Sequence, residues 1–286
     1  MKLSAFIIDR RANFMTTIIS LNQSQRCSVR NTLLKAWRSR RVWWFTATAR
    51  TKARFARTAL GSFWLGLSNL FSIAVLAAVY GTVFKVQNFS VYVVYLGIGL
   101  VVWNSISSAV GGAPNLFEHN RDHLHNINLH PIFYTLEEWA FQVQTFVQSF
   151  LLVVIALSFF QHDLLLNLLI WGWLPLFNLF LFLFWFPLLT CLVGARYRDL
   201  YQLVPIVLQL VFLLSPILYE KKNLGAMAWT ANLNPLYRVL SPVRHTLMTG
   251  ELQWLVGFAV LSVNIFGLWI SIRLLNRDRR NIPFWV

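Results

Sequence analysis

The sequence has few charged residues, and acidic residues are especially scarce. Only 12% of its 286 residues are charged, with 10 Asp and Glu against 25 Lys and Arg, whereas about a quarter of the residues in soluble domains are charged. Hydrophobic residues make up 57% of the chain. This composition excludes an ordinary water-soluble enzyme and is typical of a protein whose main solvent is a lipid bilayer.

The sequence also lacks the short motifs of several enzyme classes. It contains no Gly-x-x-x-x-Gly-Lys-Ser/Thr phosphate-binding loop, so we expect no ATP hydrolysis by that mechanism. It contains no Gly-x-Ser-x-Gly elbow, no zinc-protease His pair with Glu, and no convincing pair of carboxylates facing a membrane cavity. The sequence therefore predicts no catalytic residue, and any ATP must be bound by a partner.

Long apolar stretches recur along the chain. Six of them approach the ~20 residues that a helix needs to cross a bilayer. The predicted spans are residues 61–84, 91–113, 139–160, 164–194, 203–219 and 254–275. The fourth is too long for one straight span and contains Pro175 and Pro187, so a kink or a break is expected; the fifth is short and contains Pro205 and Pro216. The expected fold class is all-α, a polytopic membrane protein with six transmembrane helices.

Basic residues are distributed unevenly about these spans. Twenty of the 25 Lys and Arg fall on the side that holds both chain ends, and the positive-inside rule assigns that side to the cytoplasm. We therefore expect a bacterial inner-membrane protein with both termini inside. Cys27 and Cys191 then lie toward the reducing side, and no structural disulfide is predicted. Topology and anionic lipids explain the net charge of +15, so nucleic acid binding is not expected.

The chain divides into four parts on this reading. Residues 1–29 form an N-terminal cytoplasmic extension, 61–275 the transmembrane domain and 276–286 a cytoplasmic tail. Residues 30–60 mix aromatic and basic side chains, which predicts an amphipathic interface helix. Its expected apolar stripe consists of Leu33, Trp37, Trp44, Thr48 and Phe55. This helix either docks a cytoplasmic partner or only anchors the topology.

The polar loop between the second and third spans holds four histidines. His119 and His123 are spaced to share a helical face, with Glu118 and Asp122 as possible further metal ligands. A four-ligand pattern is missing, and loop histidines are usually solvated or hydrogen-bonded. No metal is therefore predicted, and the loop is interpreted as a protein-contacting surface.

Two further regions carry polar residues at membrane depth. In the third span, Gln144, Thr145, Gln148 and Ser149 fall on one side of a helix. They either bind a neighbouring helix or line a route for a polar substrate. Residues 220–253 are only moderately polar, which indicates re-entrant or interfacial helices at the periplasmic mouth, with a surface-lying loop as the alternative.

Several separate stretches of the sequence match one family in their order and spacing. They are 50–64 (RTKARFARTALGSFW), 99–104 (GLVVWN), 194–199 (GARYRD), 234–236 (NPL) and 279–286 (RRNIPFWV). Over roughly residues 40–286 the chain resembles the permease subunits of ABC polysaccharide exporters, within the type-2 permease superfamily. The last stretch resembles the tails of the O-antigen exporting branch more than those of the capsule branch.

The resemblance implies a homodimer with a continuous channel and two separate ABC nucleotide-binding subunits, which bind ATP and Mg, so that this chain needs no cofactor. It implies export of an undecaprenyl-diphosphate-linked, O-antigen-like polysaccharide, a step of lipopolysaccharide biosynthesis. The ATPase-coupling contacts would be Glu118, His119, Arg121, Asp122, His123, Arg196, Arg198 and Asp199. The external gate would contain Trp229, Asn234, Pro235 and Tyr237.

Candidate substrate contacts follow from the same comparison. Arg54 and Arg57 lie near the expected cytoplasmic entrance and would meet the lipid diphosphate, since Arg matches phosphate geometry; snorkelling to lipid headgroups is the alternative. The channel-lining candidates are Trp64, Gln144, Thr145 and Gln148. Alternative functions are an ABC permease for another lipid, a teichoic-acid-like polymer or a drug. A membrane-embedded glycolipid transferase is disfavoured by the dearth of intramembrane acids.

Overall fold

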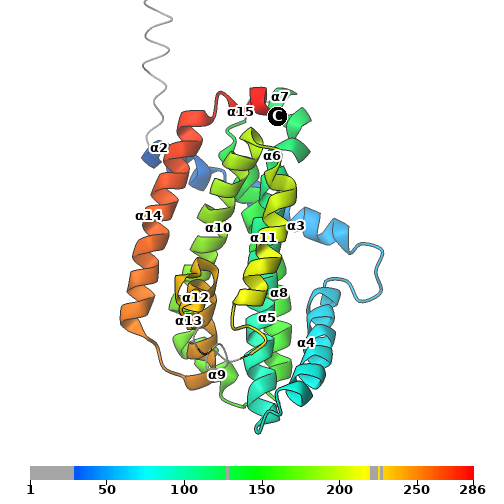
Figure 1. Ribbon diagram of the computed structural model, residues 1–286. Coiled ribbons are helices and arrows are strands. Elements are labelled where there is room, and N and C mark those ends of the chain that lie inside the picture. The colour runs from blue at the N-terminus through cyan, green and yellow to red at the C-terminus, as the bar shows by residue number, and fades with distance from the viewer. Residues whose placement is uncertain (1–28, 127–128, 220–224, 226–227) are drawn as a thin grey trace, which may run out of the picture.

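The computed structural model describes residues 29–126, 129–219, 225 and 228–286, and these segments are helical, without a strand (Figure 1). The predicted extension 1–29 lies outside the described residues except for Val29, and residues 220–224 of the expected gate lie outside them too. Within the described segments, the all-α class predicted from the sequence is confirmed.

The helices stand as an upright bundle with two distinct ends, called upper and lower after their place in Figure 1. The upper end carries α2 (Val29–Arg38), α6 (Leu116–His119), α7 (Arg121–Asn126) and α15 (Ile282–Trp285). The lower end carries α9 (Leu164–Trp171) and the connection between the first two long helices. The remaining elements are α3 (Arg40–Arg54), α4 (Phe63–Val83), α5 (Phe89–Gly112), η1 (Ala113–Asn115), α8 (Ile132–Leu157), α10 (Trp173–Arg196), α11 (Leu200–Leu214), α12 (Ala228–Leu233), α13 (Pro235–Thr249) and α14 (Trp254–Asp278).

Five of the described helices are long and apolar enough to cross a membrane, namely α4, α5, α8, α10 and α14. The multi-pass membrane character is therefore confirmed. The predicted count of six spans is not, because the fifth stretch forms only the 15-residue helix α11. At 1.5 Å per residue this helix is about 22 Å long, which is short of the ~30 Å hydrocarbon core.

The predicted third span begins later than the helix that contains it. The structure extends α8 back to Ile132, directly after Pro131, whereas the sequence prediction began at residue 139 to leave out two acidic residues. Glu138 is accommodated within the helix because its carboxylate pairs with Arg50 and accepts a hydrogen bond from Gln142.

The expected break in the fourth stretch occurs at Gly172, between α9 and α10. Pro175 explains the position, because a proline clashes with the carbonyl four residues earlier, here that of Trp171, the last residue of α9. Pro175 itself lies in the first turn of α10, where its missing N–H costs nothing. Pro187, by contrast, is inside α10 and does not end it.

Aromatic rings of α8 and α10 form much of the core. The ring centroids of Phe146 and Phe180 are 6.0 Å apart, as are those of Trp139 and Phe184, in both cases edge to face. Phe182 is buried at 2% exposure. These edge-to-face contacts stabilise the bundle.

A seam of small and polar residues joins α10 to α14. The Trp185 indole N–H donates to Asn264 Oδ1 at 2.9 Å, and Asn264 Nδ2 donates to the Asn178 carbonyl at 3.0 Å. Gly267 lies directly against the Trp185 ring, where an added Cβ would come within 2.5 Å of it. Small residues and side-chain hydrogen bonds of this kind hold transmembrane helices together, since the hydrophobic effect does not drive helix association within lipid.

We therefore expect Gly267→Ala to destabilise the protein, because the new methyl group must displace the hydrogen-bonded Trp185 ring or separate the two helices. Overpacking of this kind costs about 1–3 kcal/mol, which lowers the Tm by roughly 2–4 °C per kcal/mol in a chain of this size. Thermal unfolding of the purified protein in detergent measures it. Gly112→Ala is the control, since nothing lies within 4 Å of its Cβ position; equal Tm values for both variants would contradict the seam.

Candidate transport path and coupling surface

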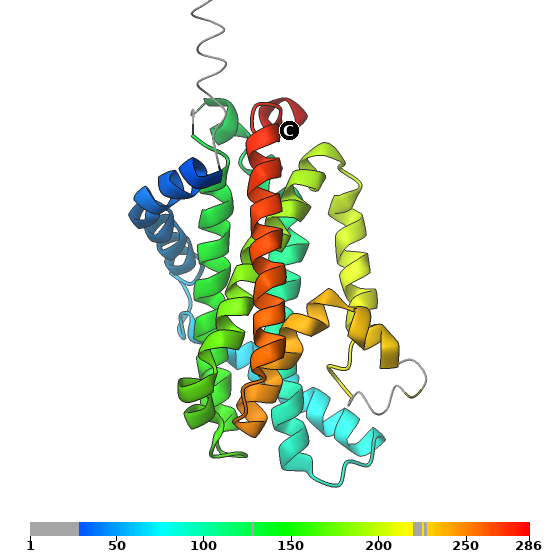
Figure 2. The same ribbon diagram turned by 90° about the vertical axis from the view of Figure 1, so that its left-hand side faces the viewer.

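The helices α2 and α3 lie across the upper part of the bundle rather than along it (Figures 1 and 2). Trp43, Ala47 and Thr51 form the buried side of α3, which contacts α8. From the predicted apolar stripe, Trp37 and Trp44 are instead exposed, at 66% and 44%. The chain thus has two apolar faces here, an inner one that binds the bundle and an outer one suited to the headgroup boundary of a bilayer.

A cluster of polar contacts fixes α3 to α8. Arg50 Nη1 contacts Glu138 Oε2 at 2.5 Å, and the Arg50 guanidinium lies 4.3 Å from the centroid of the Phe141 ring. Gln144 Nε2 donates to Thr48 Oγ1 at 3.0 Å. Gln144, a predicted channel-lining residue, therefore has a partner within the chain and acts here as a tie between the two helices.

Beside this cluster, a groove of about 160 Å³ opens between α4, α5 and α8, with Arg54 at the end of α3 on its rim. Its polar lining is continuous across three helices. Asn104 Nδ2 donates to Asn69 Oδ1 at 2.7 Å, and Asn69 Nδ2 donates to Ser149 Oγ at 2.7 Å. The other polar side chains that line it are Ser105, Ser108, Gln142 and Thr145.

The groove contains two of the predicted substrate contacts, Arg54 and Thr145. Trp64, Gln148 and Arg57 are not among its lining residues, and all three are exposed. The Asn104–Ser108 side was missed by the sequence interpretation, although a run of one Asn and three Ser inside an apolar span was a signal for it. Amides and hydroxyls with a single cation suit a neutral, hydroxyl-rich ligand that carries an anionic group at one end.

A second groove, of about 330 Å³, lies on the other flank of α5. Its lining comes from α5 and α11 and comprises Trp103, Ser107, Gly111, Pro205, Leu208, Gln209 and Phe212. Its hydroxyl side chain from α5 is Ser107, which lies in the sequence between Ser105 and Ser108 of the first groove. The upper half of α5 is therefore open on both flanks, between α4 and α11, in the single chain.

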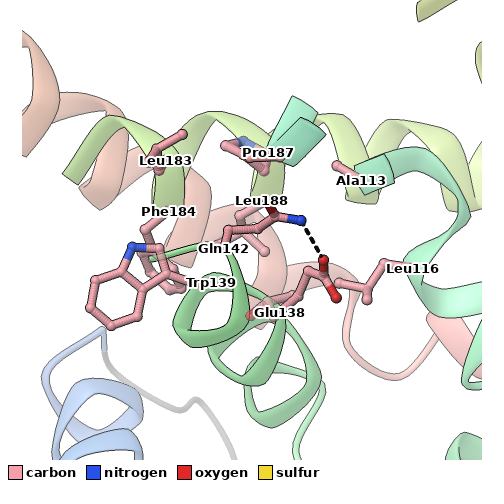
Figure 3. A pocket seen from close by; sticks show the side chains of 11 residues that line it. Ala113, Leu116, Glu138, Trp139, Gln142, Leu183, Phe184, Pro187 and Leu188 are labelled. Atoms are coloured by element: carbon pink, nitrogen blue, oxygen red, sulfur yellow. Dashed lines mark hydrogen bonds between the residues drawn. The ribbon is translucent and has the colours of Figure 1, made fainter. Parts of the chain in front are cut away.

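A small cavity of about 20 Å³ lies deeper, where α8, α10 and η1 meet (Figure 3). Glu138 and Gln142 point into this region and are joined by a 2.9 Å hydrogen bond, and Pro187 and Leu183 line the opposite side. Pro187 has no N–H, so the Leu183 carbonyl four residues earlier loses its helical partner. The volume is sufficient for one water molecule, which such a carbonyl would bind.

The predicted coupling residues come together on one surface at the upper end. Glu118 and His119 belong to α6, whereas Arg198 lies in the turn between α10 and α11. Arg198 Nη2 is 3.6 Å from Glu118 Oε2, which connects the two loops. On α7, Arg121, Asp122 and His123 are exposed; Arg196, the last residue of α10, and Asp199 in the turn are exposed too. Among the described residues no three His, Cys, Asp or Glu could hold a metal ion.

The coupling surface is pressed closely onto the membrane helices. A Cβ at Gly194 of α10 would lie 2.6 Å from Pro114 Cα in η1. Only glycine allows this approach, so the end of α10 packs directly against η1, the element that leads into α6.

After α11, the chain folds back against the bundle through α12 and α13. Asn234 caps α13 by accepting from the Leu236 N–H at 2.9 Å, and its Nδ2 donates to Ser215 Oγ at 2.6 Å. Pro235 is the first residue of α13, which its missing N–H favours. Trp229 is exposed and Tyr237 is buried. Of the predicted gate residues, Asn234 and Pro235 thus shape the start of a helix.

The family model of the ABC-2 type transporter matches residues 33–248. The chain belongs to the ABC-2 type transporter family. No curated protein matches it. An ABC-2 protein is the membrane permease of an ABC transporter and works with an ATPase partner subunit, which agrees with the absence of a phosphate-binding loop from this sequence.

In this ABC-2 permease, one arginine holds residues 215–219, the described residues that follow α11. Arg244 of α13 is only 4% exposed. Its Nη1 donates to the Pro216 carbonyl at 3.0 Å, its Nη2 donates to Tyr237 Oη at 3.2 Å, and its guanidinium lies 3.7 Å from the centroid of the Tyr95 ring. A Cβ at Gly99 would lie 3.4 Å from Nη1. The sequence interpretation gave Arg244 no role, because a single arginine in a loop region carries no pattern.

We expect Arg244→Gln to loosen residues 215–219, because a hydrogen bond to a charged donor contributes about 1.5–3 kcal/mol, so that exposure of the segment rises at least about tenfold. Ile217, which is fully buried, is replaced by Cys in a Cys27→Ser background, where the remaining Cys191 is buried. Labelling by a membrane-impermeant thiol reagent reports the exposure. The control is Arg238→Gln, an exposed position on the same helix; similar labelling in both variants would refute the role of Arg244.

Proposed function

We propose that this ABC-2 permease exports an undecaprenyl-diphosphate-linked polysaccharide, of the O-antigen type, from the cytoplasm to the periplasm. The observation that carries the proposal is the groove between α4, α5 and α8. Its lining offers amides and hydroxyls from three helices, with Arg54 as its only cation. A glycan presents many hydroxyls and no charge of its own in its simplest form, and its lipid diphosphate suits an arginine at the groove's rim.

The charge distribution supports a cytoplasmic upper end. Arg121, Arg196 and Arg198 lie there, together with the basic segment that follows α14. The basic residues described on the other side are Lys85, Arg238 and Arg244, and the positive-inside rule places the richer side in the cytoplasm. Both described chain ends are then cytoplasmic.

This topology needs a sixth crossing between α10 and α14. The segment from α10, which ends at the upper side, to α14, which starts at the lower side, runs through α11 (Figure 2). Although α11 is short, the irregular residues 215–219 continue it downward, and α12 and α13 fold back beside them as gate helices. Irregular backbone at this depth is tolerable because protein groups satisfy it.

The open flanks of α5 support a homodimer. Few residues of α4 are buried in the single chain, and α11 exposes Leu203, Ile206, Leu210 and Leu213. A second copy packed on these apolar helices would enclose the polar upper half of α5 and turn the grooves into a continuous channel. Two ATPase subunits at the upper, cytoplasmic end of the dimer complete the transporter.

The coupling surface supplies the mechanical link. ATP binding brings the two ATPase subunits together and moves α6, α7 and the turn after α10. Because Gly194 contacts Pro114, this movement is transmitted to the upper ends of α5 and α10. The two permeases then part enough to admit first the lipid diphosphate and then the glycan, and a neutral polar lining lets the sugar slide without a deep energy minimum.

Deletion of the gene in its host tests the substrate class. We expect undecaprenyl-linked polysaccharide to accumulate inside the cell while surface polysaccharide disappears, as seen on gels and by antibody access, with reversal by the intact gene. Unchanged surface polysaccharide would reject this substrate and favour a permease for another lipid, a teichoic-acid-like polymer or a drug.

A point variant tests the groove itself. Asn104→Leu removes the hydrogen bond to Asn69 and replaces an amide by an apolar group; a net hydrogen bond contributes about 0.5–1.5 kcal/mol, so export should slow about fivefold. The rate of surface polysaccharide appearance after induction measures it, at matched permease levels in the membrane. Asn104→Gln keeps the amide and should retain most of the rate. A normal rate for Asn104→Leu would mean that the substrate does not use the groove.

A further inference from the structure

The short helix α15 is firmly seated at the upper end. Ile282 is fully buried and Val286 is 6% exposed, and both belong to the same apolar cluster as Leu124 of α7. Helix α15 contacts both α7 and α10. The Arg196 guanidinium lies 5.9 Å from the centroid of the Trp285 ring. Residues 282–286 therefore form the support on which α7, part of the predicted coupling surface, rests.

One side chain of α15, that of Phe284, projects away from the other described residues. Phe284 is 87% exposed, although its neighbours are held in place. An exposed ring on a fixed backbone loses little conformational entropy on binding, which is the property of an anchor residue in a protein interface.

Lipid does not cover this ring. The amphipathic helices α2 and α3 mark the level of the headgroups, and in both views α7 and α15 lie beyond them, farther from the middle of the bundle (Figures 1 and 2). Phe284 is thus on the aqueous side of the boundary, where a large exposed aromatic ring is unfavourable unless a protein partner binds it.

The upper end that carries α7 and α15 also carries several arginines. Arg121 on α7 is exposed, and the side chains of Arg198 and Arg277, which lie 3.6 and 3.9 Å from the carboxylates of Glu118 and Asp278, are 64% and 80% exposed. A partner that fits has an apolar pocket bordered by acidic side chains, since complementary charge steers association and selects the partner.

We propose that residues 282–286 form part of the docking surface for the separate ATPase subunit, with Phe284 as its apolar anchor beside α7. The inference rests on the proposed function only in that an ATPase subunit binds at the upper end. It adds a third element to the two coupling loops, and it gives the last described segment of the chain a role in assembly.

Photocrosslinking in the native host tests the contact. A benzoyl-phenylalanine replaces Phe284 in the full chain, and after irradiation the adduct is identified by mass spectrometry. We expect an adduct with a polypeptide that carries a Gly-x-x-x-x-Gly-Lys-Ser/Thr loop. The same probe at His119 of α6 tests ATPase binding to the upper end independently, and the probe at Phe45, which is 72% exposed on α3, is the membrane-level control.

The outcomes separate the two ideas. An ATPase adduct from position 119 without one from position 284 overturns the Phe284 anchor and leaves the proposed function standing. Absence of ATPase adducts at both positions overturns both. An adduct from position 284 with lipid or with a second copy of this chain assigns the surface to that occupant and rejects the ATPase.

Substitution gives a second readout. Phe284→Ala should weaken retention of the ATPase subunit on the affinity-tagged permease about thirtyfold, as expected for loss of an interface anchor. Phe45→Ala removes a similarly exposed ring at the membrane level and should leave retention unchanged. Equal retention by both variants would show that Phe284 is not an anchor.

Discussion

The structure depends on one constraint: within a bilayer, backbone N–H and C=O groups must find their partners in the protein, because no water is available. Long helices meet it by themselves, and the interesting places are those where a helix stops. Where α11 ends before Pro216, the freed carbonyls are taken up by side chains of other helices. Tyr92 Oη donates to the Leu218 carbonyl at 2.6 Å, Tyr95 Oη to that of Pro216 at 3.0 Å, and Arg244 to the same Pro216 carbonyl.

This arrangement explains how residues 215–219 can be both irregular and stable. Their hydrogen bonds come from α5 and α13, so their position is coupled to two helices at once. A segment held by side chains rather than by its own helix is a natural place for a gate, since opening requires no helix to unfold.

The sequence predicted the five long helices well because their signal, about twenty consecutive apolar residues, is strong and local. It also anticipated a break near Pro175. It did not distinguish the two faces of α3, because Trp43 and Trp44 are both aromatic and only contact with α8 decides which one is buried. Nor did it reveal the partner of Glu138, since the acid and Arg50 lie far apart in the chain.

Only part of the candidate site was predicted, because the sequence does not show which side chains meet across helices. Thr145 and Arg54 were chosen from polarity and position, and both line the groove. Asn69 and Asn104 were not chosen. The run of Asn104 with three Ser was a signal that the interpretation passed over, whereas Asn69 stands out only by its 2.7 Å hydrogen bond with Asn104. The pairing of polar residues between helices depends on packing, which the spacing within one helix does not show.

Glu138 connects α3 with the small cavity beside Pro187. Its carboxylate binds Arg50 of the interface helix on one side and Gln142 at the small cavity beside Pro187 on the other. Gln142 also lines the substrate groove. A displacement of η1 and the end of α10 changes the walls of that cavity directly, and α8, a continuous helix, carries the change to the groove one turn away. Pro187 leaves α10 without one backbone hydrogen bond beside this cavity. The predicted coupling surface and the groove are therefore connected through a few side chains on α8.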